Sequence, residues 1–234
     1  MTALLDAHGL SFSHGQAPFL TPVLRDLSVS IRPGELTVLM GPSGSGKTTL
    51  ISILAGLLRP TSGHVDLCGE RITGMDDAAV TAARRRSLGF VFQAFHLFEA
   101  LSAVDNVAEI LALSGVPIRA ARERSRELLV RFGLGDRLDN RPGQLSAGQR
   151  QRVAIARALA PNPKIVIADE PTVALDGATA KSVMQLLREY VSGGTAVVLV
   201  THDTRLITPT DRIIELEDGR IVRDGSAHGR EEEE

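Results

Sequence analysis

The segment from Gly41 to Thr48 constrains the fold more than any other part of the chain. It reads Gly-Pro-Ser-Gly-Ser-Gly-Lys-Thr and lies directly between the apolar run Leu36–Met40 and a stretch with helical character that begins near Thr48. This matches the pattern G-x-x-x-x-G-K-[ST], in which glycines let the loop curl until several backbone N–H groups face one point. A strand, such a loop and a helix in this order predict an α/β domain with a phosphate-binding site.

The chemistry of this loop suits a triphosphate bound with Mg²⁺. The N-terminus of the following helix adds partial positive charge, and Lys47 can reach the outer phosphates. Thr48 can place its hydroxyl on Mg²⁺, a hard cation that prefers oxygen ligands. The residues predicted to bind the nucleotide here are Gly41, Pro42, Ser43, Gly44, Ser45, Gly46, Lys47, Thr48 and Thr49.

Further apolar runs predict a parallel sheet. Leu88–Phe92, Ile165–Ala168 and Ala196–Val200 are continuously apolar, as is typical of strands buried on both faces. Helical patterns separate them, so we expect helices on both sides of the sheet. These predicted helices span Thr48–Leu58, Arg150–Leu159 and Ala178–Tyr190.

An antiparallel flank is expected beside the main sheet. Leu27, Val29 and Ile31 alternate with polar residues, and the Asp218–Gly219 pair suits a hairpin turn between two short apolar runs. Strand patterns disappear between residues 94 and 144, where helical spacing predicts an inserted helical subdomain. We therefore predict one domain over 1–234, composed of a core (1–93 and 151–225), a helical subdomain (94–150) and a disordered acidic tail (226–234).

Composition narrows the range of partners. The net charge is −2, aromatic residues make up 3% of the chain and Trp is absent, so nothing favours nucleic-acid binding. Cys68 is the single cysteine, which excludes an internal disulfide and fits a reducing compartment. The first eight residues lack a signal-peptide pattern, and no apolar run approaches the ~20 residues of a membrane span. We expect a cytoplasmic location, with any membrane contact made through a partner.

Two carboxylates follow the run Ile165–Ala168. Asp169 and Glu170 stand where an open α/β sheet presents ligand-binding groups, at the carboxyl end of a strand. Asp169 can hold Mg²⁺ directly or through water. Glu170 can accept a proton from an attacking water. A carboxylate pair after a strand can also be a helix cap, so the assignment depends on its combination with the phosphate loop.

A third motif comprises Leu145-Ser-Ala-Gly-Gln149, directly before a predicted helix. Ser146 can cap that helix, and the backbone amides of Gly148 and Gln149 provide a second anion site. With the two preceding motifs, this segment resembles the signature sequence of ATP-binding cassette proteins. The resemblance covers nearly the whole chain and implies a RecA-like P-loop NTPase core with ATP and Mg²⁺ as ligands.

The resemblance also implies roles for single residues. Gln93 looks like the loop glutamine that senses Mg²⁺, Asp176 like a residue of the dimer-contacting loop, and His202 like the switch histidine at the γ-phosphate. The sequence departs from the family pattern at Ala147, where Gly is usual, and at Val173, where Ser is common. Both changes are expected to be tolerated.

Family members usually stack the adenine base on an aromatic residue ahead of the first long strand. This sequence offers Phe12 and His14 there and leaves the choice between them open. The sole tyrosine, Tyr190, stands in the wrong part of the chain for this role.

The resemblance implies a working cycle. Two copies would bind head to tail, each ATP lying between one phosphate loop and the partner's Ser146, Gly148 and Gln149, until hydrolysis through Glu170 and His202 releases them. The run Phe92–Leu97 resembles the lipoprotein-releasing, macrolide-exporting and heterocyst glycolipid-exporting ATPases. The implied function is the ATP-hydrolysing subunit of a transporter, held on the inner face of the cell membrane by a separate permease, with a periplasmic adaptor as a further partner.

Two alternatives come from other classes. A regulatory ATPase of the cell-division type would carry the same motifs and recruit partners without moving cargo; neighbouring genes would distinguish it from a transporter subunit. A small-molecule kinase would share the phosphate loop. Segment 145–149 argues against a kinase, because a kinase has no need of a second phosphate site supplied by another subunit.

Overall fold

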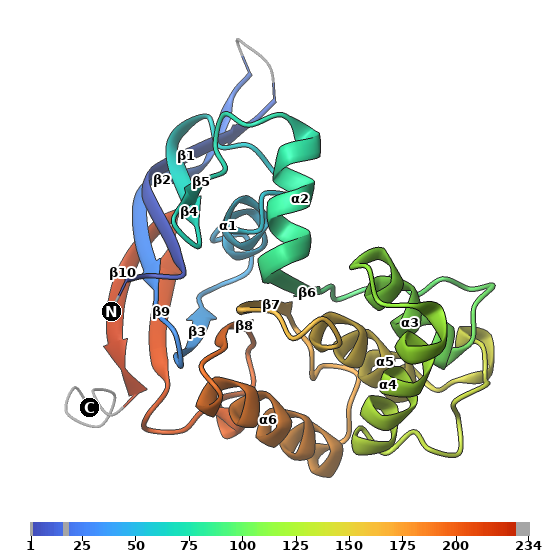
Figure 1. Ribbon diagram of the computed structural model, residues 1–234. Helices are drawn as coiled ribbons and strands as arrows, with labels where there is room; N and C mark the ends of the chain where they lie inside the picture. Colours follow the sequence, from blue (N-terminus) through green and yellow to red (C-terminus); the bar gives the residue numbers. More distant parts are fainter. Residues whose placement is uncertain (1, 16–18, 228–234) are drawn as a thin grey trace.

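Two β-sheets organise the protein, and the larger contains the predicted apolar strands (Figure 1). The computed structural model describes residues 2–15 and 19–227. In the larger sheet the strand order is β10-β9-β3-β8-β7-β6, and neighbours are parallel except at β10. Its strands are β3 (Leu36–Met40), β6 (Leu88–Val91), β7 (Ile165–Asp169), β8 (Ala196–Val200), β9 (Arg212–Glu217) and β10 (Arg220–Ser226).

The smaller sheet is antiparallel, with strand order β2-β1-β4-β5. Its strands are β1 (Leu5–His14), β2 (Thr21–Ile31), β4 (Ser62–Leu67) and β5 (Glu70–Arg71). The single antiparallel flank expected from the sequence is thus two structures. The alternating stretch that ends at Ile31 belongs to the smaller sheet, whereas the hairpin at Asp218–Gly219 extends the larger one, because β9 pairs in parallel with β3.

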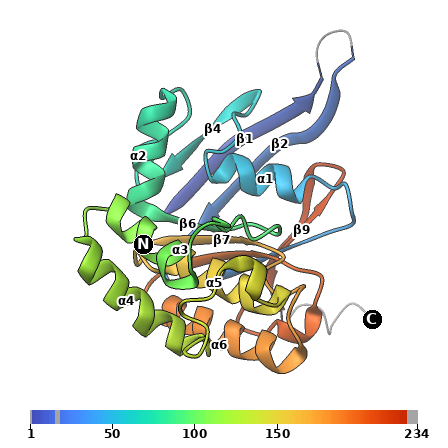
Figure 2. The same ribbon diagram turned by 90° about the vertical axis from the view of Figure 1, so that its right-hand side faces the viewer.

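Both faces of the larger sheet are covered, as predicted. Helix α1 (Lys47–Leu54) lies between the two sheets, where its buried leucines and isoleucines pack with residues of both (Figures 1 and 2). The opposite face packs against α5 (Ala147–Leu159) and α6 (Gly177–Ser192). One face is therefore covered largely by the second sheet rather than by helices alone. Helix α1 is shorter than predicted because Gly56 adopts a left-handed φ of 63° just beyond its end.

The inserted helical subdomain is present beside the β6 edge (Figure 1). Its helices are α3 (Ala103–Leu113), α4 (Ile118–Arg131) and the start of α5, and Leu129 and Phe132 are buried as their spacing predicted. The predicted boundary after residue 150 falls inside α5, which packs against α3, α4 and β6 as one continuous helix. The remaining elements are α2 (Asp77–Ser87) and two short 3₁₀ turns, Pro142–Gln144 and Thr204–Leu206.

The first residue of the predicted tail lies in regular structure. Ser226 is the last residue of β10, so residue 226 belongs to the sheet, and residues 228–234 lie outside the described residues. Cys68 is half-buried at the turn between β4 and β5 and packs against the core. None of the helices in residues 2–15 and 19–227 is long and apolar enough to cross a membrane.

Candidate functional site

The carboxyl ends of four parallel strands bring the predicted residues to one edge of the larger sheet. The phosphate loop follows β3, His202 follows β8, Glu170 follows β7 and Gln93 follows β6. These strands are neighbours in the order β3-β8-β7-β6. Residues more than 150 positions apart in the sequence therefore meet at one edge, as expected for a ligand site in an open α/β sheet.

Two glycines of the phosphate loop occupy positions that no larger residue can take. Gly41 has a φ of 139°, and a Cβ there would lie 2.0 Å from the carbonyl oxygen of Leu216. Gly46 has a φ of 102°, and a Cβ there would lie 2.8 Å from a methyl of Leu24 and 3.0 Å from the Val23 oxygen. The loop is therefore pressed between the β9 end and β2, and the missing side chains permit its curl.

Lys47 and Ser45 direct polar atoms into the curled loop. The Lys47 ammonium donates to the Gly41 and Pro42 oxygens, both at 2.8 Å, so the cation is held over the loop. Ser45 is 3% exposed, and its buried hydroxyl oxygen has no hydrogen-bond partner among the residues that the structure describes. A buried polar atom without a partner is costly, and an anion in the loop would supply one. Ser43 and Gly44 are exposed at the loop's outer side.

Thr48 and Asp169 bring two oxygen groups together across the sheet edge. Thr48 Oγ1 donates to Asp169 Oδ2 at 3.4 Å, although the two residues are 121 positions apart. Burial raises the pKa of Asp169, while the Thr48 hydrogen bond and the charge of Lys47 act in the opposite direction. A hydroxyl and a carboxylate beside a phosphate loop form a donor set that suits Mg²⁺. Thr49, next on the helix, is half-buried.

Glu170 and His202 form the second pair. His202 Nε2 lies 3.1 Å from Glu170 Oε1, and the imidazole is more exposed than the carboxylate. Burial raises the pKa of Glu170; the charge of His202 lowers it, and the neighbouring Asp169 raises it. Glu170 adopts a left-handed φ of 49°, and its N–H donates to the Val200 oxygen at 3.0 Å. A strained backbone and a shifted pKa in one residue are frequent features of functional sites.

The structure separates the two aromatic candidates for the adenine. Phe12 is 9% exposed and belongs to the core between the sheets, so its faces are covered. His14 is exposed at the end of β1 and meets the Phe12 ring edge-on at a centroid distance of 4.9 Å. Among the described residues, His14 is therefore the more exposed of the two rings, and both remain candidates for the adenine contact.

Ser146, Gly148 and Gln149 lie at the start of α5. Gln149 N–H donates to Ser146 Oγ at 3.2 Å, and Ser146 N–H donates to Gln149 Oε1 at 2.8 Å, which forms a reciprocal capping box. A Cβ at Gly148 would lie 3.2 Å from the Ala174 oxygen. Both polar side chains are thus committed to the cap, which leaves the helix N-terminus as the group available to an anion.

Asp176 caps helix α6. Its carboxylate accepts from the N–H groups of Ala178 and Thr179 at 3.1 and 3.0 Å and from the Thr179 hydroxyl at 2.7 Å. These bonds, those from Thr179 foremost, lower the pKa of Asp176. The carboxylate therefore orients the loop before α6 and is itself occupied by local bonds. Gln93 is exposed after β6.

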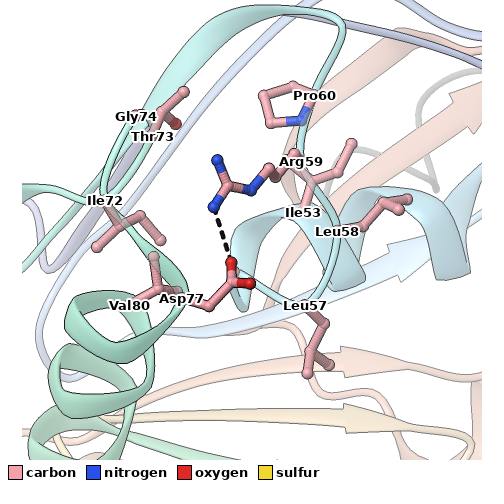
Figure 3. Close-up of a pocket in the computed structure, with 11 residues that line it drawn as sticks. Ile53, Leu57, Leu58, Arg59, Pro60, Ile72, Thr73, Gly74, Asp77 and Val80 are labelled. Atoms are coloured by element: carbon pink, nitrogen blue, oxygen red, sulfur yellow. Dashed lines mark hydrogen bonds and ion pairs between the residues drawn. The ribbon is translucent and has the colours of Figure 1, made fainter.

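Two features near the site were not predicted. A groove beside Gly44 is lined by the residues Thr21, Pro22 and Val23 of β2, by Arg25 and by the turn at Gly219. Arg157 of α5 holds the chain segment that follows Gln93. Neither has a signal in the sequence, because both depend on contacts between distant segments. A separate cavity has a volume of about 230 Å³, and none of the predicted site residues line it. Figure 3 shows the ion pair between Arg59 and Asp77 in this cavity.

Comparisons with known proteins agree with the motifs. A family model described as ABC transporter matches residues 24–173. The macrolide export ATP-binding/permease protein MacB 1 of Yersinia pestis bv. Antiqua (strain Antiqua) is 42% identical over 227 residues, which are 97% of this chain and 35% of that protein. The corresponding MacB of Chromobacterium violaceum is 46% identical over 209 residues, 89% of this chain and 32% of that protein. The chain thus spans about one third of the length of these curated relatives.

Solved structures give the same result over a complete cassette. The dimeric structure of a post-hydrolysis state of the ATP-binding cassette MJ0796, bound to ADP and Pi, superimposes with a TM-score of 0.90 at 38% identity and covers 95% of this chain and 98% of that one. A dimeric structure of MJ0796 described as a bacterial ABC transporter cassette also reaches 0.90, at 39% identity over the same shares. By its motifs, fold and relatives, the chain belongs to the ABC transporter family and is one of its ATPase cassettes.

Proposed function

We propose that the protein binds Mg-ATP at the loop between β3 and α1, hydrolyses it, and uses the cycle to drive a membrane permease. The observation that carries the proposal is the convergence of the phosphate loop, the Thr48–Asp169 pair and the Glu170–His202 pair at one sheet edge. The buried unpartnered hydroxyl of Ser45 and the two crowded glycines fit a phosphate group in the loop.

The residues divide the chemistry between them. Lys47 and the loop amides hold phosphate oxygens, while Thr48 and Asp169 hold Mg²⁺, with Gln93 as a further group at this edge. The metal neutralises phosphate charge when it is bound. Glu170 accepts the proton of the attacking water, and burial makes this carboxylate a stronger base than an ordinary glutamate. His202 orients Glu170 and lies at the γ-phosphate.

A second copy of the chain completes the site. At the start of α5, the Ser146 and Gln149 side chains each accept a hydrogen bond from the other residue's backbone N–H. We propose that this helix N-terminus binds the ATP held by the partner's phosphate loop. The dimeric structures of the related cassette support this arrangement. Asp176 positions the loop at the contact between copies, and His14 stacks on the adenine.

The membrane partner and its cargo belong to the same proposal. The relatives at 42–46% identity are named as macrolide export ATP-binding/permease proteins. We propose an exporter or a lipid- or lipoprotein-extracting system, in which the cassette lies on the cytoplasmic face of the membrane beside a permease and is joined by a periplasmic adaptor. The permease selects the cargo.

The decisive test is the solution mass of Glu170→Gln by light scattering, with and without Mg-ATP. Loss of the base blocks proton transfer, which typically contributes about 10²–10⁴-fold, so ATP persists and holds two copies together. We expect a doubled mass only when nucleotide is present. Lys47→Ala, which cannot hold the outer phosphates, should stay monomeric under both conditions. A Glu170→Gln chain that binds ATP and remains monomeric would contradict the dimer of isolated chains.

A further inference from the structure

The segment that follows Gln93 has an unusual backbone. Phe95 and His96 are consecutive and both left-handed, with φ values of 59° and 50°. Bulky residues avoid this region, and two in succession persist only where the surrounding structure fixes them. The segment is also exposed at Gln93 and His96, so its own burial does not hold it in place.

Arg157 of α5 holds the backbone of this segment in place. Its two terminal nitrogens donate to the consecutive carbonyl oxygens of His96 and Phe95, at 2.5 and 2.9 Å. The side chain crosses 61 positions of sequence to do so, and the residue is only 9% exposed. A planar guanidinium can reach two carbonyls at once in fixed geometry, whereas an ammonium acts as a single point charge.

Ring contacts hold the same segment from other sides. The Phe92 and His96 rings stack at a centroid distance of 4.6 Å, and the Arg150 guanidinium lies 5.4 Å from the centre of the Phe95 ring. Arg150 and Arg157 are both on α5, so one helix makes the polar and the cation–π contacts. The segment is thus attached to α5 more firmly than its exposure would indicate.

Gln93 lies just before the segment that Arg157 holds, two residues after the end of β6. Val91 of β6 pairs with Ala168 of β7, so Gln93 follows the end of the strand next to the one whose last residue is Asp169. We infer that Arg157 is a positioning residue that holds the 93–96 segment and thereby sets Gln93 at the Mg-ATP edge of the sheet. This inference depends on the proposed function. Since α5 also begins at the Ser146 cap, eleven residues or about 16 Å away, a movement of the helix displaces both groups.

The first measurement is hydrogen exchange in the nucleotide-free chain. Arg157→Lys keeps the positive charge but cannot donate to both carbonyl oxygens as the planar guanidinium does. We therefore expect faster exchange in the peptide covering 93–98 and unchanged exchange in β3, β7 and β8. Arg124→Lys is the matched control, because Arg124 is exposed on α4 and makes no side-chain hydrogen bond or ion pair among the described residues. Unchanged exchange at 93–98, or faster exchange across the whole domain, would overturn the inference.

The second measurement is a double-mutant cycle in ATP turnover with Gln93→Ala. Loss of a residue that orients a ligand group typically costs about 10–100-fold, so we expect Arg157→Lys to lower kcat about tenfold, with the KM for ATP within about twofold of the unmodified value. The double variant should be no slower than Gln93→Ala alone. Effects that multiply would show that Arg157 acts independently of Gln93. Normal turnover of Gln93→Ala would refute the role of Gln93 in the proposed function, and with it the positioning role of Arg157. Turnover of the Arg124→Lys control would still show that the chain is an ATPase.

Discussion

At the scale of single residues, the site depends on the environment of a few carboxylates. Asp169 and Glu170 are adjacent in sequence, yet one faces the Thr48 hydroxyl and the other faces His202. The backbone changes between them, because Asp169 ends a strand whereas Glu170 has a left-handed φ of 49°. Two neighbouring carboxylates can therefore take different roles, because each has a different partner.

The charge of His202 can be tested through the titration of Glu170. Burial raises the pKa of Glu170, and protonated His202 opposes that shift because a cation favours the ionised carboxylate. In His202→Gln the amide can still donate a hydrogen bond, but the charge is lost, so the Glu170 midpoint should move to higher pH. ¹³C NMR of the glutamate carboxyls measures it directly, with Glu170→Gln identifying the signal.

His64→Gln is the control for this titration, because His64 lies on β4 in the other sheet. It removes an imidazole of the same kind without touching the site, and the Glu170 midpoint should be unchanged. Equal midpoints in the unmodified chain and in His202→Gln would show that the imidazolium charge does not reach the carboxylate.

At the scale of elements, two hairpin turns show how a local feature supports the site. Asp218–Gly219 and Cys68–Gly69 each have two consecutive left-handed residues. A Cβ at Gly219 would lie 2.2 Å from the backbone oxygen of Val23, and the Gly219 N–H donates to the backbone carbonyl oxygen of Ser45 at 3.2 Å. The turn between β9 and β10 therefore supports both β2 and the phosphate loop, whereas Gly69 faces open space.

We predict that Gly219→Ala destabilises the protein by about 2 kcal/mol or more and weakens ATP binding. Backbone strain at a left-handed alanine costs roughly 1 kcal/mol, and displacement of the β2 backbone adds to it. Gly69→Ala also places an alanine in a left-handed backbone, but its Cβ meets no other atom. It should lower stability by only about 1 kcal/mol and leave nucleotide affinity normal. Urea unfolding and nucleotide titration of both variants test this, and equal losses in the two would disprove the role of the collision.

The sequence was sufficient for the elements with local signals. Continuous apolar runs predicted four parallel strands, and motif order predicted which loops meet at the sheet edge. It was less specific where pairing is non-local: it indicated an antiparallel flank without dividing it between two sheets, and its boundary after residue 150 falls inside α5. The burial of Phe12 and the reach of Arg157 across 61 positions depend on tertiary packing that periodicity cannot show.

At the scale of the whole molecule, the proposed nucleotide site draws its residues from both sheets. The phosphate loop leaves β3 of the larger sheet, whereas His14 and the β2 side of the groove belong to the smaller one. Helix α1 fills the space between the two sheets with apolar side chains. Apolar packing stabilises their association but is non-directional, so it does not by itself fix how the sheets are aligned. Directional contacts between the sheets are therefore expected to fix their alignment.

Arg212 makes such a contact. From β9 it donates to Asp224 at 2.6 and 2.7 Å, to Glu35 at 2.9 Å, and to the backbone oxygen of Ser30 on β2 at 2.7 Å. Removal of one partner from a largely buried ionic network leaves the others desolvated and unpaired. Because about a fifth of the side chain is exposed, solvent reduces this cost.

We predict that Arg212→Met lowers the free energy of unfolding in urea by roughly 2 kcal/mol. It should also weaken ATP binding, since the alignment of the smaller sheet with the phosphate loop relaxes. Arg220→Met makes the same exchange at an exposed position of β10, whose side chain forms no hydrogen bond or ion pair with any residue that the structure describes, and should change stability by less than about 0.5 kcal/mol. If Arg212→Met loses stability yet binds ATP normally, apolar packing around α1 alone aligns the sheets, and the network contributes only to stability.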